Sequence, residues 1–195
     1  MANERLKPFR DYSEHDVINL FAFGDHAVAL GTTDVVYAGS AVKVRTGWSN
    51  TNELSMIGNV GAGYNNTVSQ RWGVAADVEY TDGGADEAAL GILLYDVREY
   101  DENGEKLAFN PRKQAELQCS LTGQAVPIAT RGIFLMATGA WTNSPALLQD
   151  NDVFATGDGK LTTLGNKATN NRIGRTLGGP DADGSVLVKF DFTQG

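Results

Sequence analysis

Histidine and cysteine are the residues best suited to metal binding and nucleophilic chemistry, and the chain has few of them. His15 and His26 are its two histidines, and Cys119 is its one cysteine. No His-Glu-x-x-His or Cys-x-x-Cys pattern surrounds them, so a zinc site would require both histidines and a distant carboxylate. A lone cysteine cannot form an intramolecular disulfide and is more often a small buried thiol than a nucleophile. We therefore expect no metal site and no cofactor at these residues.

One glycine-containing segment looks superficially like a phosphate-binding loop. Gly58, Gly61 and Gly63 follow the order Gly-x-x-Gly-x-Gly, which is not the order of a dinucleotide-binding or P-loop motif. No Lys-Ser or Lys-Thr pair follows, and Tyr64-Asn65-Asn66 is not typical of a helix start, where the phosphate would bind. The segment is interpreted as a turn.

Two acidic turns contain the oxygen ligands that calcium prefers, Asp101-Glu102-Asn103-Gly104 and Asp181-Ala182-Asp183-Gly184. Neither has the ligand spacing or the distal glutamate of an EF-hand, and tight turns use the same residue types for their own geometry. Carboxylates are numerous enough for a glycosidase pair, but spacing singles out no two of them. The sequence has no Gly-x-Ser-x-Gly nucleophile motif. These patterns predict a protein that is not an enzyme.

The length and charge of the chain restrict its class of function further. The chain has 195 residues and a formal net charge of -8 at pH 7. Its densest basic segment is Pro111-Arg112-Lys113, which is too small for binding to a nucleic-acid backbone. The N-terminus lacks the apolar region of a secretory signal, and no run approaches the about 18 apolar residues of a membrane span. We expect a soluble chain of one domain, synthesised in the cytoplasm, that binds neither nucleic acid nor membrane.

The elements that would position functional residues are mostly β. Residues 124–129 and 133–137 are β-prone runs joined by Thr130-Arg131-Gly132, and this short glycine-containing connection predicts a β-hairpin. Pro127 has no backbone donor, which places the first run at a sheet edge or beside a bulge. The second run is apolar at nearly every position, so we expect both of its faces to be buried.

Further strands and one helix complete the predicted elements. Asn103-Gly104 predicts a type I′ hairpin turn, and Asp158-Gly159 predicts another turn. Asn110-Pro111 provides an N-cap and a first-turn proline, which predicts one short helix over 111–117. Runs separated by glycine-containing turns indicate meandering antiparallel strands at 17–23, 27–30, 35–37 and 41–45. Further strands are predicted at 72–80, 88–95, 172–177 and 185–192.

Three segments fall outside this β pattern. Residues 1–16 are charged, with isolated aromatics and no sustained period, which predicts an extended N-terminal arm that packs on its own body or on another chain. Residues 47–70 and 140–170 are polar and are expected to form two long loops. The remainder, within 17–195, is predicted to be a single mainly β domain, either a small antiparallel β-barrel or a sandwich.

One long stretch of the chain, residues 95–107, continues through 109–113 into 123–128. Further segments of the same kind lie at 16–21, 173–175 and 183–189. Together these segments resemble the head-decoration proteins of tailed bacteriophages, which cement and stabilise the capsid. The pattern of residues 73–76, 123–128 and 131–134 is also similar to the small β-barrel capsid-stabilising proteins of other phages.

The resemblance implies a non-enzymatic virion structural protein that binds the outer surface of the phage head and resists the pressure of packaged DNA. It implies two partners, the major capsid protein and further copies of the chain in a homotrimer. On this hypothesis the capsid or inter-subunit contacts involve the arm and two tryptophans, at Pro8, Phe9, Arg10, Tyr12, Trp48 and Trp141.

Two other classes of function stay open at this point. The first is a receptor- or glycan-binding head-fibre or tail component, in which Trp48, Tyr64 and Trp141 would form an aromatic platform. The tryptophans would otherwise be anchors in the core or at an interface. The second class is a hydrolase of cell-wall polysaccharide.

Overall fold

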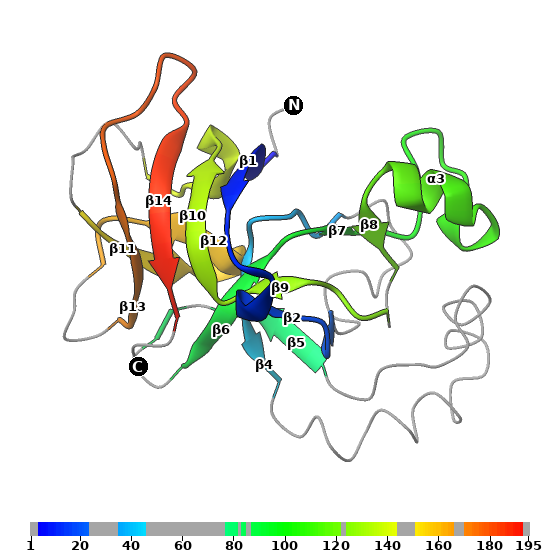
Figure 1. The fold of residues 1–195 in the computed structure, drawn as a ribbon, viewed down its shortest axis with the longest axis horizontal. Helices are drawn as coiled ribbons and strands as arrows, with labels where there is room; N and C mark the ends of the chain where they lie inside the picture. The colour runs from blue at the N-terminus through cyan, green and yellow to red at the C-terminus, as the bar shows by residue number, and fades with distance from the viewer. Residues whose placement is uncertain are drawn as a thin grey trace.

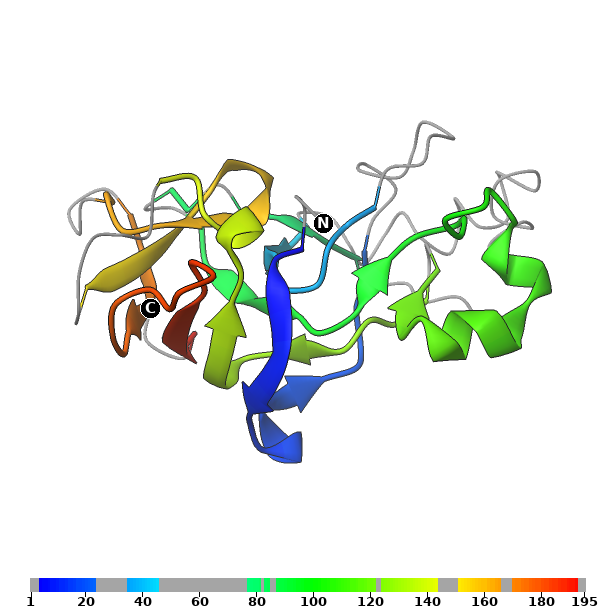
Figure 2. The ribbon, with the colours of Figure 1, turned by 90° about the horizontal axis from the view of Figure 1, so that it is seen from above.

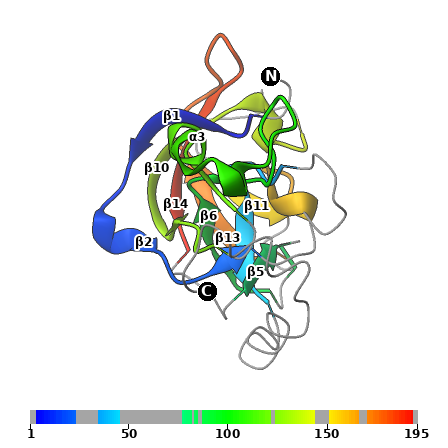
Figure 3. The same ribbon diagram turned by 90° about the vertical axis from the view of Figure 1, so that its right-hand side faces the viewer.

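The computed structural model describes residues 4–23, 35–45, 77–81, 83–84, 87–121, 124–143, 151–165 and 170–192. In this part of the chain strands dominate and one short α-helix is present, which confirms the mainly β fold expected from the sequence. The sheets are curled and form a half-barrel, as Figure 3 shows from the side of the helix.

The first six-stranded sheet contains both the N-terminal and the C-terminal strand (Figure 1). Its order is β1-β10-β14-β13-β11-β12, and every neighbouring pair is antiparallel. The strands are β1 (Leu6–Asp11), β10 (Arg131–Met136), β11 (Asp152–Thr156), β12 (Lys160–Thr162), β13 (Arg172–Thr176) and β14 (Val186–Asp191).

The second six-stranded sheet is made of shorter strands in the order β2-β9-β6-β4-β5-β3. Its pairs are antiparallel except β3 with β5, which is parallel. The strands are β2 (Val17–Ile18), β3 (Ala22–Phe23), β4 (Ala41–Val44), β5 (Asp77–Tyr80), β6 (Ala89–Leu93) and β9 (Ile128–Ala129). The meander expected over 17–45 is wrong, because β2, β3 and β4 do not pair with one another in the described residues, and β3 runs parallel to β5.

A separate lobe projects from the body and carries the only α-helix of the described residues (Figures 1 and 2). The parallel pair β7 (Asp96–Val97) and β8 (Cys119–Ser120) joins it to the body. The helix α3 (Pro111–Glu116) begins as predicted, because the Asn110 side chain accepts a hydrogen bond from the Lys113 backbone N–H at 3.2 Å. Short 3-10 turns lie at Glu14–Asp16, Leu107–Phe109, Thr138–Ala140 and Gly157–Gly159.

The main core is buried between the two sheets, and the lobe has a small core of its own. Phe134 and Phe190 of the first sheet belong to the same buried cluster as Ile92 of the second. Along β14 the burial alternates, with Val186, Val188 and Phe190 buried and the residues between them more exposed, as the period of two predicts. The lobe buries Leu107, Ala108, Cys119 and Leu121.

The predicted hairpin at 124–137 is wrong, because its two strands belong to different sheets. β9 pairs with β2 and β6, whereas β10 pairs with β1 and β14. At the corner, Thr130 donates its backbone N–H to Asp16 at 2.8 Å and accepts from Phe192 at 3.1 Å. Gly132 has φ +150°, and a Cβ there would lie 2.8 Å from the Asp11 carbonyl oxygen. The glycine thus serves a sheet-to-sheet corner rather than a tight turn.

Two finer expectations about this region also differ from the structure. β9 lies between β2 and β6, inside its sheet rather than at an edge. Pro127 stands just before the strand and therefore removes no ladder donor from it. In β10, Phe134 and Met136 are buried while Ile133 and Leu135 are partly exposed, so one face of the run is buried rather than both.

Of the two predicted turns, the one at 158–159 is present and the one at 103–104 has a different geometry. At 101–104 only Gly104 has positive φ, and its N–H donates to the Asp101 carbonyl at 3.2 Å, so the type I′ turn expected at Asn103-Gly104 is wrong. At Asp158-Gly159 both residues have positive φ, and the predicted turn connects β11 to β12. These two strands lie inside the expected loop at 140–170, because Val153, Phe154 and Leu161 are buried in the core.

Several sequence-based predictions lie outside the described residues. They are the strand at 27–30, the loop at 47–70, the first half of the strand at 72–80, and the side chains Trp48 and Tyr64.

Candidate functional site

The N-terminal segment contributes β1, which lies at one edge of the first sheet and packs on the body of its own chain (Figure 1). Its pairing with β10 is interrupted: Leu6 lies opposite Met136 and Arg10 lies opposite Phe134, so residues 7–9 face Leu135 alone. Pro8 lacks the N–H that a regular ladder would use, which is why an edge bulge suits it. β1 is therefore extended, as expected, and bulged at its centre.

The bulge exposes the aromatic ring of Phe9 between two residues that contact the core, Leu6 and Tyr12. Phe9 is 56% exposed, and Pro8 is exposed beside it, whereas Leu6 is 7% exposed. After the strand, Tyr12 is 37% exposed and stacks on the buried Phe134 ring, with centroids 5.7 Å apart and planes 14° from parallel. The chain on both sides of Phe9 is thus held to the core while Phe9 itself faces solvent.

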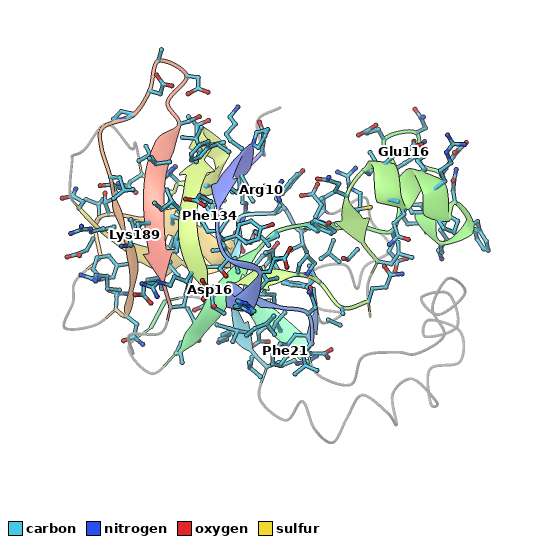
Figure 4. All side chains as sticks on the ribbon, in the orientation of Figure 1. Arg10, Asp16, Phe21, Glu116, Phe134 and Lys189 are labelled. Carbon is cyan, nitrogen blue, oxygen red and sulfur yellow. The ribbon has the colours of Figure 1, made fainter. Side chains whose placement is uncertain are left out.

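Arg10 points away from β10 toward the second sheet and the lobe (Figure 4). Its Nη1 donates to the Leu94 carbonyl oxygen at 3.2 Å. No ion pair to Arg10 is present in the part of the chain that the structure describes. The structure therefore brings together four predicted residues of the arm, with Phe9 exposed and Arg10 and Tyr12 partly held by the body.

Arg5 is a buried cation that sequence reasoning missed. It is 7% exposed, and its Nη1 donates to Ser40 Oγ at 2.8 Å and to the Asp158 carbonyl oxygen at 2.7 Å. Its guanidinium also lies 6.0 Å and 5.9 Å from the ring centroids of Tyr37 and Tyr80. No sequence signal distinguishes Arg5 from the other charges of the segment, because its partners are distant in sequence.

Burial shifts the pKa values of Arg5 and Tyr80 in this group of side chains. It lowers the pKa of Arg5, although the nearby charges of Tyr80 and Asp158 oppose the shift. It raises the pKa of Tyr80 to about 12, and the charge of Arg5 reduces that shift. Arg5 thus anchors the start of β1 as a cation bound by neutral oxygens and aromatic rings.

A cleft of about 540 Å³ lies between β1 and the lobe. Strand β1, the segment at 37–38, β7 and the end of α3 all contribute to its walls. Its lining residues are Glu4, Arg5, Leu6, Arg10, Tyr37, Ala38, Leu94, Asp96, Arg98, Glu102, Leu117 and Gln118. The cleft combines guanidinium groups, carboxylates and leucine side chains, a composition that can bind a polar ligand with an apolar stem.

Arg98 lines the cleft with a largely buried side chain that has one unpartnered nitrogen. Its side chain is 14% exposed and its nearest carboxylates, of Asp96 and Glu102, lie 3.6 Å and 3.8 Å away, beyond hydrogen-bond length. Its Nε is buried and has no hydrogen-bond partner among the described residues. Gln118, also in the cleft, has φ +49°, an uncommon conformation for a residue other than glycine.

The acidic turns use their carboxylates for their own geometry. Asp101 accepts hydrogen bonds from the backbone N–H groups of Asn103 at 2.8 Å and Glu105 at 2.7 Å, and it forms an ion pair with Lys113. The Lys113 hydrogen bond is the main cause of the lowered pKa of Asp101. In the other turn, Asp183 accepts from the Ser185 backbone N–H at 2.9 Å. Across the described ranges, no three His, Cys, Asp or Glu side chains are grouped as metal ligands.

Cys119 and Trp141 are core residues. Cys119 is buried in the lobe, as expected, and burial raises the pKa of its thiol to about 11. Trp141 is 6% exposed and packs in the main cluster, so its ring faces the core rather than the surface. Trp141 is thus a core anchor, the second of the two interpretations of the tryptophans. In this conformation it cannot contribute to an exposed aromatic platform.

Comparison with known protein families and with curated proteins finds no match to this chain. Among the helices of the described residues, none has the length and apolar character needed to cross a bilayer. Within the described residues, the two candidate binding features are the β1 bulge and the cleft beside it.

Proposed function

We propose that the protein is a virion decoration protein, which binds the outer surface of a phage head and stabilises it against the pressure of packaged DNA. Its partners in this role are the major capsid protein and further copies of itself in a homotrimer. The protein acts by attachment and catalyses no reaction. The resemblance of its sequence to head-decoration proteins suggests the class, and the exposure of Phe9 on the β1 bulge supports it.

An exposed phenylalanine on a fixed bulge is suited to attachment. Transferring such a ring from water to an apolar contact contributes about 1.5–3 kcal/mol. Leu6 is buried and Tyr12 stacks on Phe134, so the backbone on both sides of Phe9 is already ordered before binding. A contact that needs little ordering keeps most of its free energy for association.

A decoration protein benefits from modest contacts because they are repeated. Each copy that joins several shell subunits gains from the effective concentration of the second contact once the first has formed. If the protein binds the assembled shell more tightly than its separate subunits, that binding also stabilises the shell by linkage. The acidic charge of the chain, -8 at pH 7, keeps the free protein soluble before it attaches.

The test is co-sedimentation of the full chain with purified phage heads that lack their decoration protein. We expect the wild-type chain to sediment with the heads and to raise the temperature at which they release DNA. Phe9→Ser should weaken binding by about tenfold, because about 1.4 kcal/mol of lost contact corresponds to that factor. Since Phe9 is exposed, the same variant should change the free energy of unfolding by less than about 0.5 kcal/mol.

Leu164→Ser is the matched control. Leu164 is 71% exposed and follows β12, the strand at the opposite edge of the same sheet. We expect this variant to bind heads like the wild-type chain. Point variants are preferable to deletion of the segment, since deletion would also remove the buried Arg5 and Leu6. A wild-type chain that leaves the heads bare, or equal losses in the two variants, would contradict the proposal.

A further inference from the structure

Asp101 is a buried carboxylate in the lobe, and its two oxygens have different surroundings. Its side chain is 0% exposed. Oδ1 accepts hydrogen bonds from the backbone N–H groups of Asn103 at 2.8 Å and Glu105 at 2.7 Å. Oδ2 contacts Nζ of Lys113, in the first turn of α3. One oxygen is thus held by two neutral donors, while an amine nitrogen lies against the other.

Local structure fixes the backbone of both side chains. The Asp101 N–H donates to the Glu105 carbonyl oxygen at 3.0 Å, and the Asp101 carbonyl oxygen accepts from Gly104 at 3.2 Å. Lys113 is placed by the helix cap, because its backbone N–H donates to the Asn110 side chain at 3.2 Å. Groups that are already held together react without a further loss of chain entropy.

A third group that can transfer protons lies beside the pair. Glu105 Oε2 is 3.7 Å from Nζ of Lys113, and the Glu105 side chain is 68% exposed. The Lys113 side chain is 27% exposed, so the amine borders solvent on this side and a released water can leave. A carboxylate in this place can take a proton from nitrogen and return it to a leaving oxygen. An amine, a held carboxyl group and a proton carrier are the groups that amide formation needs.

We propose that Lys113 and Asp101 become joined by a side-chain amide bond, with Glu105 as the proton carrier. One proton first passes within the pair from Nζ to Oδ2, which leaves a neutral amine and a neutral acid. Nζ then attacks Cγ of Asp101, and the two backbone N–H groups stabilise the negative charge on Oδ1. Glu105 moves a proton from Nζ to Oδ2, the Cγ–Oδ2 bond breaks, and Oδ2 leaves as water. The step consumes no oxidant, reductant or other reactant.

The bond is expected to form slowly and once per molecule. The hydrogen bond between the two side chains raises the pKa of Lys113 and lowers the pKa of Asp101, so the charged pair predominates over the neutral pair that reacts. The finished amide removes both charges and closes a loop between the turn and α3, as a disulfide would. This is a self-modification without turnover, and it does not depend on whether the chain binds a phage head.

The experiment is mass spectrometry of the full chain, kept folded at neutral pH for several days and then denatured. We expect the wild-type chain to be lighter than its sequence by the mass of one water. Trypsin does not cleave after an acylated lysine, so digestion should release a branched peptide that joins residues 99–106 to residues 113–131. Fragmentation of this peptide should place the branch at Asp101.

Lys113→Arg is the matched control. Arginine keeps the positive charge beside Asp101 but forms no such amide, so this variant should fold like the wild-type chain and retain the full sequence mass. Glu105→Gln removes the proton carrier at an exposed position and should slow bond formation by more than about tenfold.

Three results would overturn the proposal. The first is a wild-type chain that keeps its full sequence mass. The second is a loss of water that persists in Lys113→Arg, since this indicates a cyclic imide at an Asp-Gly step such as Asp158-Gly159. The third is a branched peptide that joins Lys43 to Glu87, another lysine and carboxylate in contact. An unchanged rate in Glu105→Gln would refute the role of Glu105.

Discussion

Replacing Gly132 by alanine tests the corner between the two sheets. The glycine has φ +150°, a backbone conformation that alanine adopts at a cost of about 1–3 kcal/mol. The new Cβ would also lie 2.8 Å from the Asp11 carbonyl oxygen and 2.7 Å from the Phe134 ring. The ring can shift, but the carbonyl belongs to β1, so overpacking adds about 1–3 kcal/mol. We expect Gly132→Ala to lower the free energy of unfolding by about 2–6 kcal/mol.

Two other glycines separate the cost of the backbone conformation from the cost of overpacking. Gly104 has φ +80° with no atom within 4 Å of the added Cβ, so Gly104→Ala should cost only the backbone part, about 1–2 kcal/mol. Gly178 has open space and no left-handed φ, so Gly178→Ala should be neutral or slightly stabilising, because alanine restricts the unfolded chain. Urea unfolding of the three variants measures these differences. A cost for Gly132→Ala no larger than that for Gly104→Ala would refute the close approach of β1 to the corner.

Two further predictions concern buried titratable groups. Because burial raises the pKa of Cys119 to about 11, the folded chain should react with an aromatic disulfide reagent at pH 8 more than about a hundredfold more slowly than the unfolded chain, and equal rates would show that the lobe core is open. Burial likewise raises the pKa of Tyr80 to about 12, so its stabilising contribution is complete below the usual tyrosine pKa and is lost as pH rises through the folded value. Urea unfolding between pH 9 and 12 should therefore show a fall in stability that is smaller in Tyr80→Phe.

Local sequence signals predicted the elements whose cause is local. The helix α3 begins where Asn110 caps it and Pro111 occupies the first turn. The alternation of apolar and polar residues along β14 matches its buried and exposed faces. The turn at Asp158-Gly159 follows from two residues that tolerate positive φ. Each of these signals acts within a few residues, so no knowledge of distant segments is needed.

The candidate site was predicted only in part. Phe9 and Tyr12 stand out in the sequence because they are aromatics in a charged segment, and the structure places them on and beside β1. The cleft was not predicted, since Arg10 and Arg98 are brought to it by strands that are far apart in the chain. Arg5 was missed for the same reason, because Ser40 and Asp158 are its hydrogen-bond partners.

By itself, the sequence determined that the chain is mainly β, with a capped helix after Asn110 and a buried lone thiol, because periodicity, capping and composition are properties of neighbouring residues. The tertiary structure decided which strands pair. It places residues 128–129 and 131–136 in different sheets, on either side of Thr130, although their spacing is typical of a hairpin. Pairing depends on which distant edges can bury the same apolar faces, and that competition is settled only when the whole core packs.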